Sequence, residues 1–162
     1  MSVPPIWGNG AIFPIVPEPS MPLHLIKLAV GIRDLDHMAE VQGRRAYTVD
    51  GRSIVPVYTR RVPKRGEEIL EGGSIYWVVR GNVAARQRVL AINTGVDEEG
   101  ESYCTLGIDA ELVPTVPTAH RPFQGWRYLE PQVAPKDLAD AAGQGDELPA
   151  HLAAELRALG LL

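Results

Sequence analysis

The sequence predicts an α+β domain with a small antiparallel, barrel-like sheet, one helix before the sheet and two helices after it. The strongest observation is Gly81-Asn82, which separates two runs rich in β-branched and aromatic residues. Gly and Asn tolerate positive φ, so this dipeptide is typical of a tight hairpin turn. A second hairpin is predicted where an acidic, glycine-containing stretch, residues 95–100, leads into the apolar run 102–108. Helical signals flank these strands on both sides.

Length and composition favour a single domain, residues 21–162, behind a proline-rich tail, residues 1–20. The chain has 162 residues, of which 45% are hydrophobic and 22% are charged, as in ordinary globular proteins. The tail contains five prolines and a single charge, so we expect it to contribute little to folding. Two interpretations of the tail stay open: Met21 is an alternative start, or the tail wraps the domain through its apolar side chains.

The first strand and the first helix follow the tail. Residues 23–30 form a mostly apolar run that His24 and Lys27 interrupt, which predicts a strand. Asp34 is a favourable N-cap for a helix that continues to about Ala46.

Two further predicted strands contain proline, which cannot donate a ladder hydrogen bond. Residues 55–59 include Pro56, and residues 112–116 include Pro114. Both strands are therefore expected at sheet edges or entries.

The central hairpin has a predicted register. With the turn at Gly81-Asn82, Arg80 pairs with Val83, and Trp77 then faces Arg86. The same register places four side chains together on the face of the hairpin opposite Trp77 and Arg86: Tyr76, Val78, Ala85 and Gln87.

The C-terminal part combines a polar-aromatic segment with two helices. Residues 120–131 are expected to cross the end of the sheet. One helix begins near Pro135 and ends before Gly143, because proline is favoured in a first helical turn. The second helix, about residues 149–159, carries a leucine stripe that is expected to dock on the domain.

The net charge of −4 is unevenly distributed along the chain. Residues 60–96 contain seven basic and three acidic side chains, whereas residues 97–162 contain four basic and twelve acidic ones. The central basic block either attracts a phosphate or carboxylate, or pairs with the acidic C-terminal part.

Basic and aromatic side chains form the predicted ligand-binding set. Its members are Arg60, Arg61, Lys64, Arg65, Trp77, Arg86, Arg88, His120, Arg121 and Trp126. Trp77 beside Arg86 suits a stacked base with a neighbouring phosphate, and the alternative is a core tryptophan under arginine side chains. The loop 60–65 precedes Gly66, an arrangement suited to an anion, although its cations are equally able to pair with nearby glutamates. The residues around 120–128 either complete the cleft or anchor a long connection.

Motifs for catalysis and for metal binding are missing from the sequence. No serine lies in a Gly-x-Ser-x-Gly elbow, the four histidines lack metal-ligand spacing, and there is no phosphate-binding Gly-rich loop. We therefore predict no metal and no cofactor.

The chain resembles an uncharacterised bacterial family, domain of unknown function 1489, at residues 23–28, 60–66, 75–79 and 125–129. This resemblance implies no established activity. A weaker, fold-level resemblance to PUA-like and ASCH-type barrels rests on Gly66-Glu67-Glu68-Ile69. It implies RNA or modified-nucleobase binding, and in the amidohydrolases of that type a Lys and a Glu, for which Lys64 and Glu67 are the candidates here.

These observations predict an RNA- or modified-nucleotide-binding module with a basic, aromatic cleft. The alternatives are a small amidohydrolase-like enzyme acting on a modified nucleoside, and a structural or partner-binding protein. The chain contains a single cysteine, Cys104, and its first twenty residues do not resemble a signal peptide. No apolar run is long enough to span a bilayer, so a cytoplasmic protein without a membrane segment is expected. The oligomeric state is left open.

Overall fold

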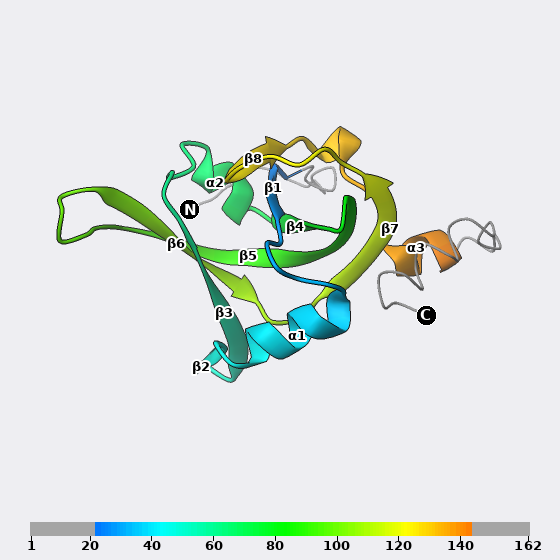
Figure 1. Ribbon diagram of the computed structural model, residues 1–162, viewed down its shortest axis with the longest axis horizontal. Helices are drawn as coiled ribbons and strands as arrows, with labels where there is room; N and C mark the ends of the chain where they lie inside the picture. The colour runs from blue at the N-terminus through cyan, green and yellow to red at the C-terminus, as the bar shows by residue number, and fades with distance from the viewer. Residues whose placement is uncertain (1–21, 144–162) are drawn as a thin grey trace, which may run out of the picture.

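The computed structural model describes residues 22–143 and shows a mostly-β α+β fold built on one curved, mixed sheet (Figure 1). The strands are β1 (His24–Leu28), β2 (Tyr47–Val49), β3 (Arg52–Thr59), β4 (Ser74–Val79), β5 (Asn82–Val96), β6 (Ser102–Asp109), β7 (Val113–Ala119) and β8 (Trp126–Leu129). The helices are α1 (Leu35–Gly43), α2 (Gly66–Leu70), the 3₁₀ turn η1 (Pro131–Val133) and α3 (Leu138–Gly143).

The eight strands form a sheet that curves but does not close. Their order is β2-β3-β6-β5-β4-β1-β8, and β7 pairs with β5 outside this path. The long strand β5 pairs with β4 and β7 through its first half and with β6 through its second, and the β5–β6 hairpin projects at the left of Figure 1. Within the described residues, no ladder joins β3 to β8. The predicted barrel-like sheet is thus an open one.

The sheet is also not purely antiparallel, because β1 and β4 run parallel. The chain between them passes through α1, β2, β3 and α2 before it returns, which is the kind of long crossover that parallel neighbours require. The coarse prediction of an α+β fold with hairpins is confirmed, and the antiparallel, closed arrangement is corrected.

Strand β4 is buried over its whole length and separates two hydrophobic clusters. Ile75, Trp77 and Val79 belong to the larger cluster, which α1 helps to cover. Tyr76 and Val78 belong to the smaller cluster on the other face. Side chains alternate between the two faces of a strand, so residues one position apart on β4 contribute to different surfaces of the protein.

Helix α1 begins as the sequence predicts. The Asp34 carboxylate accepts a hydrogen bond from the His37 backbone N–H at 2.8 Å, which satisfies a free donor of the first turn. The helix ends at Gly43, three residues before the predicted end at Ala46. Gln42 near this end exchanges side-chain hydrogen bonds with the fully buried Gln87 of β5, which fastens the helix to the sheet.

The central hairpin forms, but its turn lies one residue earlier than predicted. Arg80 and Gly81 have φ values of 51° and 85°, and two successive positive values define the type I′ turn that suits a two-residue hairpin. A register shift near Ala84 then moves the pairing again. As a result Arg86 faces Tyr76, and the predicted pairing of Trp77 with Arg86 is wrong.

The same shift changes which side chains share a face. The predicted grouping of Tyr76 and Val78 with Ala85 and Gln87 is wrong, because Ala85 pairs with Trp77 in the larger cluster. Val83 takes its place opposite Val78 in the smaller cluster.

Both predicted proline-containing strands lie at edges. Pro56 lies on β3 beyond the three residues that pair with β2, and Pro114 lies on β7, whose only strand partner in the described part of the chain is β5.

The C-terminal segment is more regular than the sequence indicates. Part of the segment 120–131 forms β8, which pairs with β1, where a crossing connection was expected. Helix α3 begins at Leu138, beyond Pro135. The predicted helix 149–159 and the tail 1–20 fall outside the described residues. Between residues 22 and 143, no helix has the length and apolar character needed to cross a bilayer.

Candidate binding sites

The open side of the sheet contains a basic cavity, which we call the seam cleft. It has a volume of about 470 Å³ and lies between the end of β3 and the start of β8. Its lining residues are Lys27, Tyr58, Thr59, Arg60, Arg61, Gln124, Gly125, Trp126 and Arg127. Four of the nine are cations, and no described residue with a carboxylate side chain lines the cavity.

Arg61 and Trp126 join the two sides of the seam cleft. The Arg61 guanidinium donates to the Trp126 carbonyl at 2.6 Å, and the Trp126 indole N–H donates to the Arg61 carbonyl at 2.8 Å. The guanidinium carbon also lies 4.0 Å from the Trp126 ring centroid, a close cation–π contact. These contacts use neutral partners, and no described carboxylate forms an ion pair with Arg61 in the wall of the cleft.

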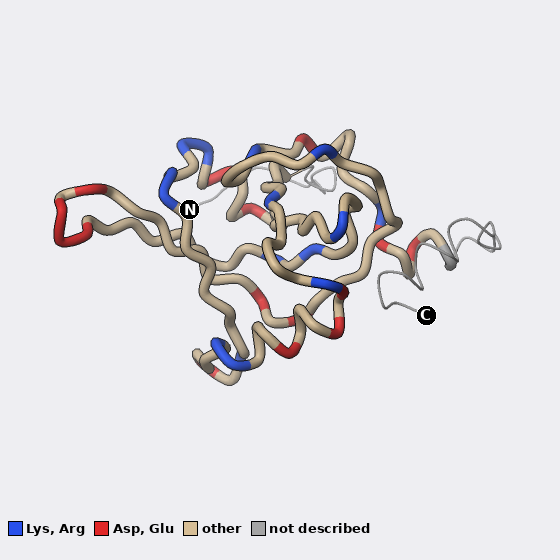
Figure 2. The backbone as a smooth tube through the Cα atoms, viewed as in Figure 1, with Lys and Arg blue, Asp and Glu red and all other residues tan. Residues whose placement is uncertain are grey.

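The cations of the cleft differ in how far they are neutralised. Arg60 donates to the Asp97 carboxylate at 2.8 Å, at the base of the acidic hairpin tip. Figure 2 shows the basic loop and this acidic tip at the same end of the molecule. Arg127 lies over the Phe123 ring, with 5.1 Å to its centroid, and forms no ion pair with any described residue.

Lys27 is the least exposed cation of the seam cleft. Its strand neighbours Trp77 and Trp126 flank it on β4 and β8. Burial lowers the pKa of Lys27 below its ordinary value of 10.5, and no described carboxylate opposes this shift. A bound anion would supply the missing opposite charge.

An exposed aromatic side chain lies at the edge of the seam cleft. Tyr58 is 66% exposed and also lines a smaller apolar cavity of about 270 Å³, which reaches Trp77. Trp77 itself is 6% exposed and donates its indole N–H to Gln87 at 2.8 Å. The core interpretation of Trp77 is therefore the one that its burial supports, and Tyr58 is the available stacking surface.

The other residues of the basic loop point to different partners. Arg65 forms ion pairs with Glu68 and Glu130. Lys64 and Glu67, the candidates for acid/base chemistry, are both exposed and form no ion pair with each other. None of these residues lines the seam cleft. The loop is thus divided between Arg60 and Arg61, which line the cleft, and Lys64 and Arg65, which do not, with Arg65 paired to two glutamates.

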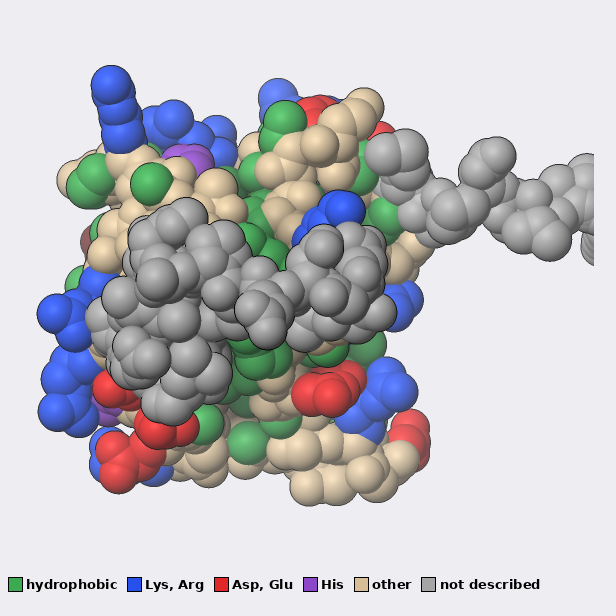
Figure 3. All heavy atoms as spheres, turned by 90° about the vertical axis from the view of Figure 1, so that its right-hand side faces the viewer, with side chains coloured by type: hydrophobic (Ala, Val, Ile, Leu, Met, Phe, Trp, Pro, Cys, Tyr) green, Lys and Arg blue, Asp and Glu red, His purple; other side chains and the backbone are tan. Residues whose placement is uncertain are grey.

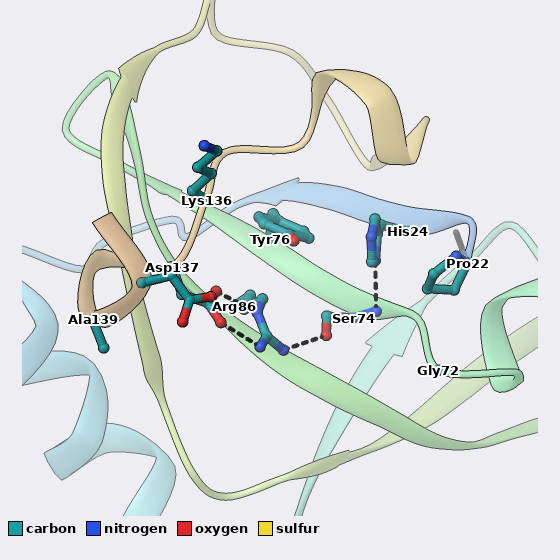
Figure 4. A pocket seen from close by; sticks show the side chains of 10 residues that line it. Pro22, His24, Gly72, Ser74, Tyr76, Arg86, Lys136, Asp137 and Ala139 are labelled. Carbon is teal, nitrogen blue, oxygen red and sulfur yellow. Dashed lines mark hydrogen bonds and ion pairs between the residues drawn. The ribbon is translucent and has the colours of Figure 1, made fainter. Parts of the chain in front are cut away.

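Arg86 lies in a second cavity, which we call the Arg86 pocket, with a volume of about 750 Å³ (Figure 4). Its lining residues are Pro22, His24, Gly72, Ser74, Tyr76, Arg86, Lys136, Asp137, Ala139 and Asp140. It shares no residue with the seam cleft. His24 and Lys27 lie on opposite faces of β1, which explains how one strand contributes to two separate sites.

The three remaining predicted ligand-binding residues line neither cavity. Arg88 is exposed at the start of the β4 pairing, opposite Ser74. His120 follows β7, where its ring packs against Phe123, and Arg121 beside it is exposed. The ten predicted residues therefore do not form one cleft.

Sequence reasoning missed several residues of the two cavities. His24 and Lys27 carried a usable signal, because they interrupt an otherwise apolar strand. Tyr58 carried a weaker one, as an aromatic residue on the exposed side of an edge strand. Asp137 had none, since its position beside Arg86 depends on a contact between residues 51 apart in the chain.

Comparisons with known proteins identify one family. The protein family described as protein of unknown function (DUF1489) matches residues 25–162, which is most of the chain. No curated protein and no solved structure shows significant similarity to the chain. The resemblance to PUA-like and ASCH-type barrels finds no support in these comparisons or in the open sheet. The predicted resemblance to the domain of unknown function 1489 is confirmed, and the chain belongs to the DUF1489 family.

Proposed function

We propose that the protein binds a phosphate-bearing ligand of the nucleotide or single-stranded RNA type in the seam cleft. The observation that carries this proposal is the charge of the lining: four cations surround the cavity, and no carboxylate of the described residues lines it. Three of these four cations, Arg61, Arg127 and Lys27, form no ion pair with any described residue.

The charge of the whole protein gives no general attraction for polyanions. The net charge is −4. Acidic and basic side chains are both present on the face shown in Figure 3, with uncharged groups between them. Affinity for a polyanion must therefore come from a local surface, and the seam cleft provides one.

Tyr58 adds a contact that distinguishes nucleotides from simple anions. A base stacked on an aromatic ring gains about 1–3 kcal/mol regardless of its sequence. Tyr58 is exposed at the edge of the same cavity that the arginines line. A ligand with both a phosphate and a flat ring would use both features, which favours nucleotides over inorganic phosphate.

The test is a titration of labelled single-stranded RNA and of a mononucleotide with wild type and three variants, each at several salt concentrations. Arg127→Ala should weaken binding evenly across sequences and reduce the salt dependence, since a lost phosphate contact releases fewer counterions. Tyr58→Ala should weaken binding by about 1–3 kcal/mol with little change in salt dependence.

Arg65→Ala is the matched control for Arg127→Ala. Arg65 belongs to the same basic loop as the cleft residues, but Glu68 and Glu130 pair with it and it lies outside the cleft. We expect near wild-type binding from this variant. The proposal fails if wild type shows no salt-sensitive binding at low ionic strength, or if Arg65→Ala weakens binding as much as Arg127→Ala.

A further inference from the structure

Hydrogen bonds to Asp137 and Ser74 hold Arg86 in place in the wall of the Arg86 pocket. The Arg86 guanidinium donates through Nε and Nη2 to the two Asp137 carboxylate oxygens, both at 2.7 Å. Its Nη1 donates to the Ser74 hydroxyl at 3.0 Å. Ser74 is fully buried, so this bond fixes Arg86 from beneath the pocket wall. Figure 4 shows this chain of bonds along one wall of the pocket.

His24 has a defined tautomer in the same pocket. Its Nδ1 accepts a hydrogen bond from the Ser74 backbone N–H at 3.0 Å, so the proton of the neutral ring is on Nε2. Burial and the Arg86 charge lower the pKa of His24 from 6.5 to about 4, so the ring is neutral at pH 7. Between residues 22 and 143, Nε2 has no hydrogen-bond partner, and it is not among the atoms fully removed from solvent.

Tyr76 supplies a further donor next to His24. The two rings meet edge to face with centroids 5.0 Å apart. Burial raises the pKa of Tyr76, so its hydroxyl keeps its proton at neutral pH. The hydroxyl has no hydrogen-bond partner in the described part of the chain. His24 and Tyr76 therefore bring two neutral donors into one pocket.

The charges around these donors select the kind of acceptor. Arg86 and Asp137 neutralise each other, and the exposed Lys136 and Asp140 add one charge of each sign to the lining. The His24 Nε2–H and the Tyr76 hydroxyl lie side by side as donors, an arrangement that suits the two oxygens of a carboxylate. Because the four charged side chains of the lining sum to zero, they do not offset the larger desolvation cost of a doubly charged phosphate, and a singly charged carboxylate costs less to desolvate.

We propose that the Arg86 pocket binds the carboxylate group of a small molecule, with His24 and Tyr76 as hydrogen-bond donors and Lys136 as the neighbouring cation. This site is separate from the seam cleft and does not depend on the proposed nucleotide binding.

The test follows the His24 ring by ¹⁵N NMR of the full chain at pH 7, during titration with acetate and, separately, with phosphate at matched ionic strength. His24→Asn identifies the His24 signals, because the asparagine oxygen preserves the acceptor for Ser74 N–H while Nε2 is lost. In wild type the Nε2 signal should shift saturably with acetate. Tyr76→Phe keeps the ring packing and removes only the donor, and it should raise the dissociation constant about tenfold.

Two further variants make the outcome decisive. Arg127→Ala in the seam cleft should leave the acetate titration unchanged. Lys136→Ala, at an exposed position, should weaken acetate binding even if Tyr76→Phe does not fold. The proposal is overturned by any of three results: no saturation up to about 100 mM acetate, the same midpoint in wild type and in both pocket variants, or saturation by phosphate at lower concentration than acetate.

Discussion

The Arg86–Asp137 ion pair is expected to stabilise the fold far more than any exposed ion pair of this protein. Its side chains are only 26% and 20% exposed, and both bonds are 2.7 Å long. Removing one partner of a buried pair costs about 3–5 kcal/mol, whereas exposed pairs contribute about 0–1 kcal/mol. With roughly a quarter of each side chain in solvent, we expect Arg86→Ala and Asp137→Ala to cost about 2–4 kcal/mol each.

The double-mutant cycle isolates the pair itself. The double variant loses both charges together and leaves neither one unpaired, so its cost should be less than the sum of the single costs by about 2 kcal/mol. Urea unfolding of all four proteins, followed by tryptophan fluorescence, measures these free energies. The three tryptophans of the chain include Trp77 and Trp126, which are both buried and should report loss of the core.

Arg65 and Glu68 provide a matched control for this cycle. They form an equally close ion pair, with an Nε–Oε2 distance of 2.8 Å, but their side chains are 43% and 52% exposed. The coupling free energy from the same cycle should be about 0.5 kcal/mol or less. If the Arg86–Asp137 coupling is no larger than the Arg65–Glu68 coupling, the reasoning from burial is wrong.

Two further effects on stability are expected. The low pKa of His24, about 4 against 6.5 for an ordinary histidine, means that between these pH values only the unfolded state takes up the proton, so stability is lost as pH falls through this window. Wild type should lose up to about 3 kcal/mol more than His24→Asn between pH 7 and pH 4 in urea unfolding, and parallel profiles would contradict the buried neutral ring. At the turn, Gly81→Ala should cost about 1 kcal/mol of stability because φ of Gly81 is 85°. Arg80→Asn should stabilise the protein slightly because asparagine tolerates the φ of 51° found at Arg80. Thermal melts with the opposite signs would contradict the type I′ turn.

Local signals predicted the elements of the fold better than their arrangement. The Asp34 cap, the two hairpins and the proline-containing edges each depend on a few neighbouring residues, and all are present. Closure of the sheet depends instead on whether β3, beyond its short pairing with β2, forms a ladder with β8. Arg61 and Trp126 are joined there by side-chain-to-carbonyl hydrogen bonds in place of a backbone ladder, and no short sequence pattern indicates this.

The register of the central hairpin shows why the candidate site was harder to predict than the fold. Gly81 serves equally well in a turn with Arg80 or with Asn82, so the turn residues alone do not determine the register of the hairpin. The earlier turn changes each pairing by two residues and leaves the side chains of β5 on their predicted faces. The one-residue shift at Ala84 is the change that moves Ala85, Arg86 and Gln87 to the other face.

The register is determined by polar groups that are distant in the chain. In the observed register Arg86 reaches Asp137, and Gln87 on the opposite face reaches Trp77, Gln42 and the Asp109 carbonyl. In the predicted register these two side chains exchange faces. Arg86 would then enter the larger apolar cluster without a carboxylate, and Gln87 would lose its partners, a cost of several kcal/mol. The candidate site therefore became predictable only once the partners of two buried polar side chains were known.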